Sequence, residues 1–131
     1  MNLGNGGGNY GNGVRARARK RSVVYARNST PFRKGGGHGL IDQVNRCMLA
    51  SAESGYEVVN VFQDLARGVS LSRKNLERLF GFCFNPINNV SAVVITTQDR
   101  LSQNPDHYQA IAERLACLGI DLIVVDMSMP H

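Results

Sequence analysis

The chain has 131 residues, of which 43% are hydrophobic, and it carries a formal net charge of +5. That length supports one hydrophobic core but is too short for two domains. No apolar run approaches the length of a membrane span and no charged-then-apolar leader opens the chain, so we expect a cytoplasmic protein. Cys47, Cys83 and Cys117 lack the paired spacing of metal ligands, so we expect no metal and three thiols buried under helices.

Positive charge is concentrated near the N-terminus. Residues 14–34 hold eight cations and no acid, which leaves seven cations against ten acids in the rest of the chain. Such a run suits a polyanion such as DNA, although a solvated tail accounts for it equally well. The cations expected to contact phosphates are Arg15, Arg17, Arg19, Lys20, Arg21, Arg33 and Lys34.

Composition also separates a tail from a folded part. Residues 1–13, "MNLGNGGGNYGNG", are Gly/Asn-rich and the segment "RARARKR" follows them, so we expect residues 1–21 to be disordered. The folded domain is expected to comprise residues 22–131, and its first strand to carry the apolar run 23–26. The segment "RNSTPFRKGGGHG" then predicts a long loop, in which we expect His38 to be solvent-exposed.

Hydrophobic periodicity predicts three helices and three further strands after this loop. The first helix begins at residue 40 and ends near Gly55, a strand covers 56–62, and 63–71 form a loop. Ser72 is expected to cap the second helix, a strand covers 91–97, Pro105 opens the third helix, and a strand covers 120–126. The inward positions are expected to be Leu40, Ile41, Val44, Cys47, Met48 and Ser51 in the first helix, Leu76, Leu79, Phe80 and Cys83 in the second, and Ile111, Leu115 and Leu118 in the third.

This alternation predicts an α/β fold with three layers. A mostly parallel sheet of four to five strands should carry helices on both faces. Because parallel strands end at one edge, the loops that follow them should bring one hydroxyl, that of Ser29, close to Arg27, Arg73, Asp99 and Arg100. Each residue alone is weak evidence, but a hydroxyl among planar cations is what phosphoryl chemistry requires.

Three motifs carry a family resemblance. "YARNST", "DLARGVSLSRKNLERL" and "VVITTQDRLSQN" resemble, in this order, the motifs of the serine recombinases, the resolvase and invertase family. The resemblance runs from about residue 22 to the C-terminus and includes the spacing of Asp64 to Arg73. It implies the resolvase-like form of this fold and cleavage and rejoining of double-stranded DNA through a 5′-phosphoserine link. It also implies an oligomer, either a dimer or tetramer of this chain or an assembly with a longer recombinase, and no metal or other cofactor.

The resemblance assigns roles to individual residues. Ser29 matches the nucleophile, and the arginines that bind the scissile phosphate match Arg27, Arg73 and Arg100. Asp99 matches the acid beside them, and Gln43 matches the glutamine on the first helix.

The chain departs from the family pattern at three points. The family has a second arginine where this chain has Gln103, and a small hydroxyl residue where it has Arg67, which is a candidate for the missing charge. The loop after Ser29 is longer than usual, and the chain stops at His131, where the family continues into a dimerisation helix and a DNA-binding domain.

Two other functions compete with the recombinase interpretation. The first is a catalytically weak relative that binds DNA or a recombinase partner as an accessory protein, which the loss of arginine at Gln103 favours. The second is an unrelated phosphate-binding α/β domain. It is disfavoured because no glycine-rich turn leads directly into a helix N-terminus.

Overall fold

The computed structural model describes residues 19–28, 39–65 and 73–126. Its strands are β1 (Lys20–Asn28), β2 (Tyr56–Leu65), β3 (Val90–Ile95) and β4 (Asp121–Val124). Its helices are α1 (Leu40–Glu53), α2 (Lys74–Phe84) and α3 (Pro105–Cys117), with short 3-10 turns η2 (Pro86–Asn88) and η3 (Gln98–Arg100). None of these helices is long and apolar enough to cross a bilayer.

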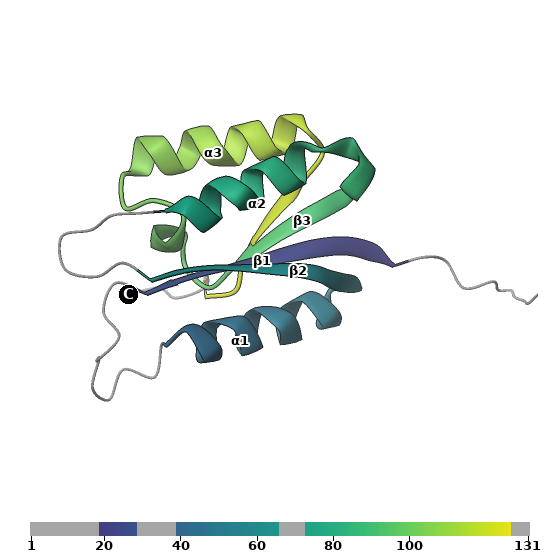
Figure 1. The fold of residues 1–131 in the computed structure, drawn as a ribbon, viewed down its shortest axis with the longest axis horizontal. Coiled ribbons are helices and arrows are strands. Elements are labelled where there is room, and N and C mark those ends of the chain that lie inside the picture. Colours follow the sequence, from purple (N-terminus) through teal and green to yellow (C-terminus); the bar gives the residue numbers. More distant parts are fainter. Residues whose placement is uncertain (1–18, 29–38, 66–72, 127–131) are drawn as a thin grey trace, which may run out of the picture.

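The described strands form one parallel sheet in the order β2-β1-β3-β4. Helix α1 covers one face, and α2 and α3 cover the other (Figure 1). The prediction of a three-layer α/β fold is therefore confirmed. We call the side where the four strands end the C-terminal edge, and the side where they begin the N-terminal edge.

The two central strands are buried on both faces. Val23 and Tyr25 pack in a core beneath α2 and α3, while Val24 packs against Cys47 of α1 on the opposite face. This alternation follows from the two-residue period of a strand. All residues from Ser22 to Ala26 are fully buried, so β1 is a rigid element that carries its last residues to the C-terminal edge.

The residues at the helix ends are of types that favour starting or ending a helix. Asn104 caps α3 by accepting hydrogen bonds from the backbone N–H groups of Asp106 at 2.8 Å and His107 at 3.1 Å, and Pro105 follows it. Gly55 and Gly119 follow α1 and α3 with φ of +86° and +76°, a conformation that glycine adopts without strain. Ser72, the predicted cap of α2, lies outside the described residues, and Arg73 occupies the N-cap position.

The apolar face predicted for α1 is wrong in part. Ile41 and Met48 are exposed, at 78% and 43%, and the buried residues are Gln43, Cys47 and Ser51. Ser51 shares a 2.6 Å hydrogen bond with Ser22 of β1, so a polar pair turns this face inward. Ser51 is inward as predicted, whereas the predicted face lacks Gln43, because a polar side chain adds nothing to an apolar stripe.

Other expectations need smaller corrections. Cys47 and Cys83 are buried, and burial raises the pKa of each thiol to about 12, but Cys117 is exposed because it ends α3. Leu118, just beyond that end, is 52% exposed. Strand β1 begins at Lys20, inside the predicted tail. Strand β2 continues to Leu65, into the predicted loop 63–71, whereas β3 and β4 are shorter than predicted.

Candidate active site

The described candidate residues gather at the C-terminal edge of the sheet. Arg27 and Asp64 lie near the ends of β1 and β2 and face each other in the β1–β2 register. Arg100 belongs to η3, which follows β3, and Arg73 immediately precedes α2. Ser29 follows the last residue of β1 but lies outside the described residues, as do Arg15, Arg17, Arg33, Lys34, His38 and Arg67.

Asp64 caps helix α2 from the neighbouring strand. Its carboxylate accepts the backbone N–H groups of Asn75 and Leu76, each at 3.0 Å, and the Tyr25 hydroxyl at 2.7 Å. The side chain is only 6% exposed, so these three donors replace the water that a buried carboxylate loses. The start of α2 is thereby fixed to β1 and β2.

Tyr25 lies between this carboxylate and an arginine. Burial is the largest cause that raises the pKa of Tyr25 to about 12; the hydrogen bond from Arg73 opposes it and the bond to Asp64 adds to it. The guanidinium of Arg73 lies over the Tyr25 ring, 5.7 Å from its centre, and one terminal nitrogen is 3.4 Å from the hydroxyl oxygen. Tyr25 therefore stays a neutral donor to Asp64 at ordinary pH.

Arg73 also contacts the loop that carries Arg100. Its Nη2 donates to the carbonyl oxygen of Arg100 and its Nη1 to that of Leu101. These two bonds join the start of α2 to the end of η3, two segments that follow different strands. The sequence placed Arg73 at the site but gave no sign that its partners would be main-chain carbonyls.

Gln43 supports the backbone at the end of β1. Its side-chain amide accepts the N–H of Arg27 at 3.1 Å and donates to the Arg27 carbonyl at 3.0 Å. Pairing of β1 with β3 ends at Val24, whereas pairing with β2 continues to Asn28, so this amide replaces the missing partners on the β3 side. The glutamine that the family resemblance singled out thus holds the main chain of a site arginine.

Four buried side-chain atoms in the described residues have no hydrogen-bond partner: Nε of Arg27, Nε of Arg73, Nε of Arg100, and Oγ1 of Thr96. Thr96 directly follows β3, so all four belong to the C-terminal edge. A buried donor without a partner costs roughly 1–3 kcal/mol, and more when the group is charged. Three such donors at one edge, each on a cation, suit an anionic ligand at this edge.

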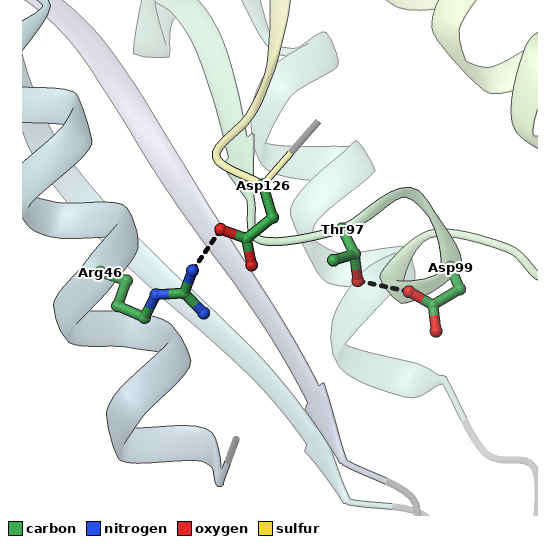
Figure 2. A network of polar contacts seen from close by, with 4 residues as sticks. All are labelled: Arg46, Thr97, Asp99 and Asp126. Atoms are coloured by element: carbon green, nitrogen blue, oxygen red, sulfur yellow. Dashed lines mark hydrogen bonds and ion pairs between the residues drawn. The ribbon is translucent and has the colours of Figure 1, made fainter. Parts of the chain in front are cut away.

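The acidic residues near this edge have other partners (Figure 2). Asp99 accepts the hydroxyl of Thr97, and no ion pair between described residues involves Asp99. Asp126, just beyond β4, pairs with Arg46 of α1, and its N–H donates to the Thr96 carbonyl at 2.8 Å. Arg46 was missed in the sequence, because nothing there links positions so far apart.

The remaining candidates are less centrally placed. Gln103 is exposed between η3 and α3 and carries no charge. Arg19, Lys20 and Arg21 lie at the N-terminal edge, where Arg21 Nε donates to the Asn88 carbonyl at 2.7 Å. From Arg21 to Arg27 the strand rises about 20 Å, so these three cations are not at the site. No group of His, Cys, Asp and Glu suited to a metal ion occurs in the described ranges.

Comparison with known proteins identifies the class. Residues 22–130 match the family model of the resolvase N-terminal domain. The catalytic domain of ISC1926 TnpA, an IS607-like serine recombinase, is 32% identical with a TM-score of 0.68, and the match covers 85% of this chain and 71% of that one. The chain therefore belongs to the serine recombinase (resolvase) family, and site-specific recombination is the function that this membership supports.

Two more distant structures share the fold. A resolvase family site-specific recombinase from Streptococcus pneumoniae is 20% identical with a TM-score of 0.72, covering 85% of this chain and 75% of that one. The catalytic domain of TP901-1 integrase is 23% identical with a TM-score of 0.67, covering 84% and 80%. No curated protein matches the chain.

Proposed function

We propose that residues 22–131 form a serine recombinase catalytic domain in which Ser29 is the nucleophile. Ser29 is the next residue in the sequence after Asn28, and Asn28 ends β1 at the edge where the three arginines lie. In the cleavage step, Ser29 Oγ bonds to phosphorus and the bond from phosphorus to the 3′ oxygen breaks. The serine proton ends on the departing 3′-hydroxyl, and the 5′-phosphate stays on the protein. Rejoining reverses both exchanges, so no external energy source is needed.

The unsatisfied Nε atoms of Arg27, Arg73 and Arg100 are the observation that carries this proposal. A phosphodiester gains negative charge on its non-bridging oxygens as the serine attacks. Preorganised cationic donors stabilise that charge without reorganising, and each typically contributes a factor of about 100 to 1,000 in rate. Asp99, bonded to Thr97, is the acid that the proposal places beside them.

The adduct itself is the test, and it needs no knowledge of the target sequence. The full chain is incubated with a pool of random-sequence duplexes, the DNA is digested, and peptides are examined by mass spectrometry. We expect a nucleotide-phosphate mass on Ser29 that disappears in Ser29→Ala. The variant Thr30→Ala removes the adjacent hydroxyl instead and should keep the adduct. An adduct that survives in Ser29→Ala would overturn the assignment.

The partner in this proposal is double-stranded DNA in the cytoplasm, bound by an oligomer. The family acts on DNA as an oligomer in general; we propose a dimer or tetramer of this chain, or an assembly with a longer recombinase. The basic N-terminal residues would add phosphate contacts outside the site. Removing residues 1–18 deletes Arg15 and Arg17, so the slope of log affinity against log salt should become shallower by up to about 2. An unchanged slope would show that these residues only solvate the chain.

Gln103 favours a second candidate, an accessory protein with weak catalysis. Its exposed amide stands where the family has an arginine, so one charged donor is missing. If this loss limits the enzyme, Gln103→Arg should raise adduct formation and Arg67→Ser should leave it unchanged. If Arg67 supplies the charge, Arg67→Ser should abolish the adduct instead. DNA binding with no adduct in any of these variants would favour the accessory role.

A further inference from the structure

Arg73 is built into the site differently from Arg27 and Arg100. Both of its terminal nitrogens donate to main-chain carbonyls, those of Arg100 and Leu101, whereas its Nε has no partner. We propose that Arg73 is a positioning residue for Arg100: its fork ties the start of α2 to η3 and thereby sets where Arg100 meets the phosphate. The part concerning phosphate rests on the proposed function, but the tie itself does not.

The anchor on the α2 side is rigid. Arg73 is the N-cap residue of α2, and the buried carboxylate of Asp64 accepts the N–H groups of Asn75 and Leu76 in the first turn of that helix. Leu76 is 4% exposed in the core. The Tyr25 ring beneath the guanidinium restricts its remaining freedom. The guanidinium of Arg73 is therefore attached to a rigid part of the molecule.

The segment on the other side is anchored in the core by the fully buried side chain of Leu101, but its main chain forms only a short turn. Turn η3 is three residues long. Its closing hydrogen bonds are Arg100 N–H to the Thr97 carbonyl at 3.1 Å, and Leu101 N–H and Ser102 N–H to the Gln98 carbonyl at 3.0 Å and 3.3 Å. The carbonyls at the end of so short a turn have no continuing helix to satisfy them. Arg73 fills both, so it fixes the main chain at Arg100 and Leu101, while the buried Leu101 side chain anchors the end of the turn in the core.

The chemistry of the fork makes the inference specific to arginine. A guanidinium presents five N–H donors in a rigid plane, so it spans two successive carbonyls and still offers Nε to an anion. An ammonium is a point charge that cannot hold the same geometry. If Arg73 acted through its charge alone, lysine at this position would largely preserve its function. If Arg73 acts through its two hydrogen bonds to the carbonyls, lysine cannot replace it.

Hydrogen exchange of the DNA-free full chain tests the tie without any reaction. We expect Arg73→Lys to speed exchange of the Leu101 and Ser102 amides at least tenfold, while Arg27→Lys, the matched control at the same edge, leaves them unchanged. Unchanged exchange in Arg73→Lys would overturn the proposal. Should that variant unfold, Tyr25→Phe is read instead: it keeps the ring and removes the hydroxyl, and a several-fold increase at the same amides is expected, with no increase overturning the tie.

A double-mutant cycle on adduct formation tests the consequence for Arg100. If Arg73 acts through Arg100, then Arg73→Lys should slow the reaction far less in an Arg100→Lys background than in the wild type. Additive losses would make Arg73 an independent phosphate ligand and overturn the proposal. If no variant and no wild-type protein forms an adduct, the proposed function fails, and the exchange measurement still decides the tie.

Discussion

An arginine lies near each end of β1, and the two differ in whether the Nε atom has a hydrogen-bond partner. At the N-terminal edge, Nε of Arg21 is satisfied by the Asn88 carbonyl. At the C-terminal edge, Nε of Arg27 is buried without a partner, as are those of Arg73 and Arg100. Within one strand, Arg21 therefore binds the main chain of the protein, whereas the Nε of Arg27 is available to an anionic ligand. Positive charge is present at both edges, so it is the unsatisfied buried donors that single out the C-terminal edge as the proposed site.

The largest expected effect comes from removing the unsatisfied donors. Arg27→Gln or Arg100→Gln should lower the rate of adduct formation about 100-fold to 1,000-fold, because transition-state charge loses a donor. Stability to urea should change little, since no protein hydrogen bond to Nε is lost. Arg21→Gln is the matched variant: it should cost about 1 kcal/mol of stability and leave the rate unchanged. An equal loss of rate in Arg21→Gln would contradict the view that only the arginines at the C-terminal edge act in the reaction.

The sequence predicted the architecture but not this distinction. The apolar runs within β1 and β3, separated by periodic helices, led to the parallel three-layer sheet, and its topology placed Arg27, Arg73 and Arg100 at one edge. The hydrogen bonds were not predictable. Asp64 bonds to the backbone of α2 and Gln43 to the backbone of β1, and such bonds depend on packing between segments that no local pattern records.

Errors in the prediction have the same origin. Expected apolar positions such as Ile41 and Leu118 are exposed, whereas Ser22 is fully buried because Ser51 satisfies it. The contact of Arg21 with DNA stays a prediction, and the sequence did not show that its Nε donates to a carbonyl of the protein. Residue type indicates what a side chain is able to bind, but only the fold shows whether that capacity has already been used.

Asp64 and Asp121 allow the two edges to be compared through carboxylates. Each accepts a tyrosine hydroxyl, but Asp64 is buried and also caps α2, whereas Asp121 is exposed and accepts Tyr56 at 3.2 Å. Asp64→Ala should lower the free energy of unfolding by about 3 kcal/mol, because two buried donors and one partly buried donor lose their acceptor. Asp121→Ala should cost less than about 1 kcal/mol. Urea denaturation measures the free energy of unfolding of both variants. Similar decreases in the two would contradict the expectation that the buried carboxylate of Asp64 stabilises the fold more than the exposed one of Asp121.

The raised pKa of Tyr25 predicts a smaller, pH-dependent effect. Its pKa is about 12 in the folded protein, against 10.0 for an ordinary tyrosine, so its contribution to stability is complete below pH 10 and is lost as the pH rises through 12. Between pH 9 and 11 this amounts to about 1 kcal/mol. Tyr25→Phe should therefore flatten the fall in stability over this range. Tyr56→Phe is the control from the other edge, and a greater flattening there would contradict the assignment.

The ion pair of Arg46 and Asp126 should have the smallest effect. Its side chains are 33% and 22% exposed, so solvent screens it, and a double-mutant cycle with Arg46→Gln and Asp126→Asn should give a coupling of about 0.5–1 kcal/mol that falls in 1 M salt. Arg46 lies at the same edge as Arg27, but its charge already has a partner. If an unmet donor defines the site, Arg46→Gln must leave adduct formation unchanged. A 100-fold loss would show that nearness to the edge, and not the state of the donor, decides which arginines act.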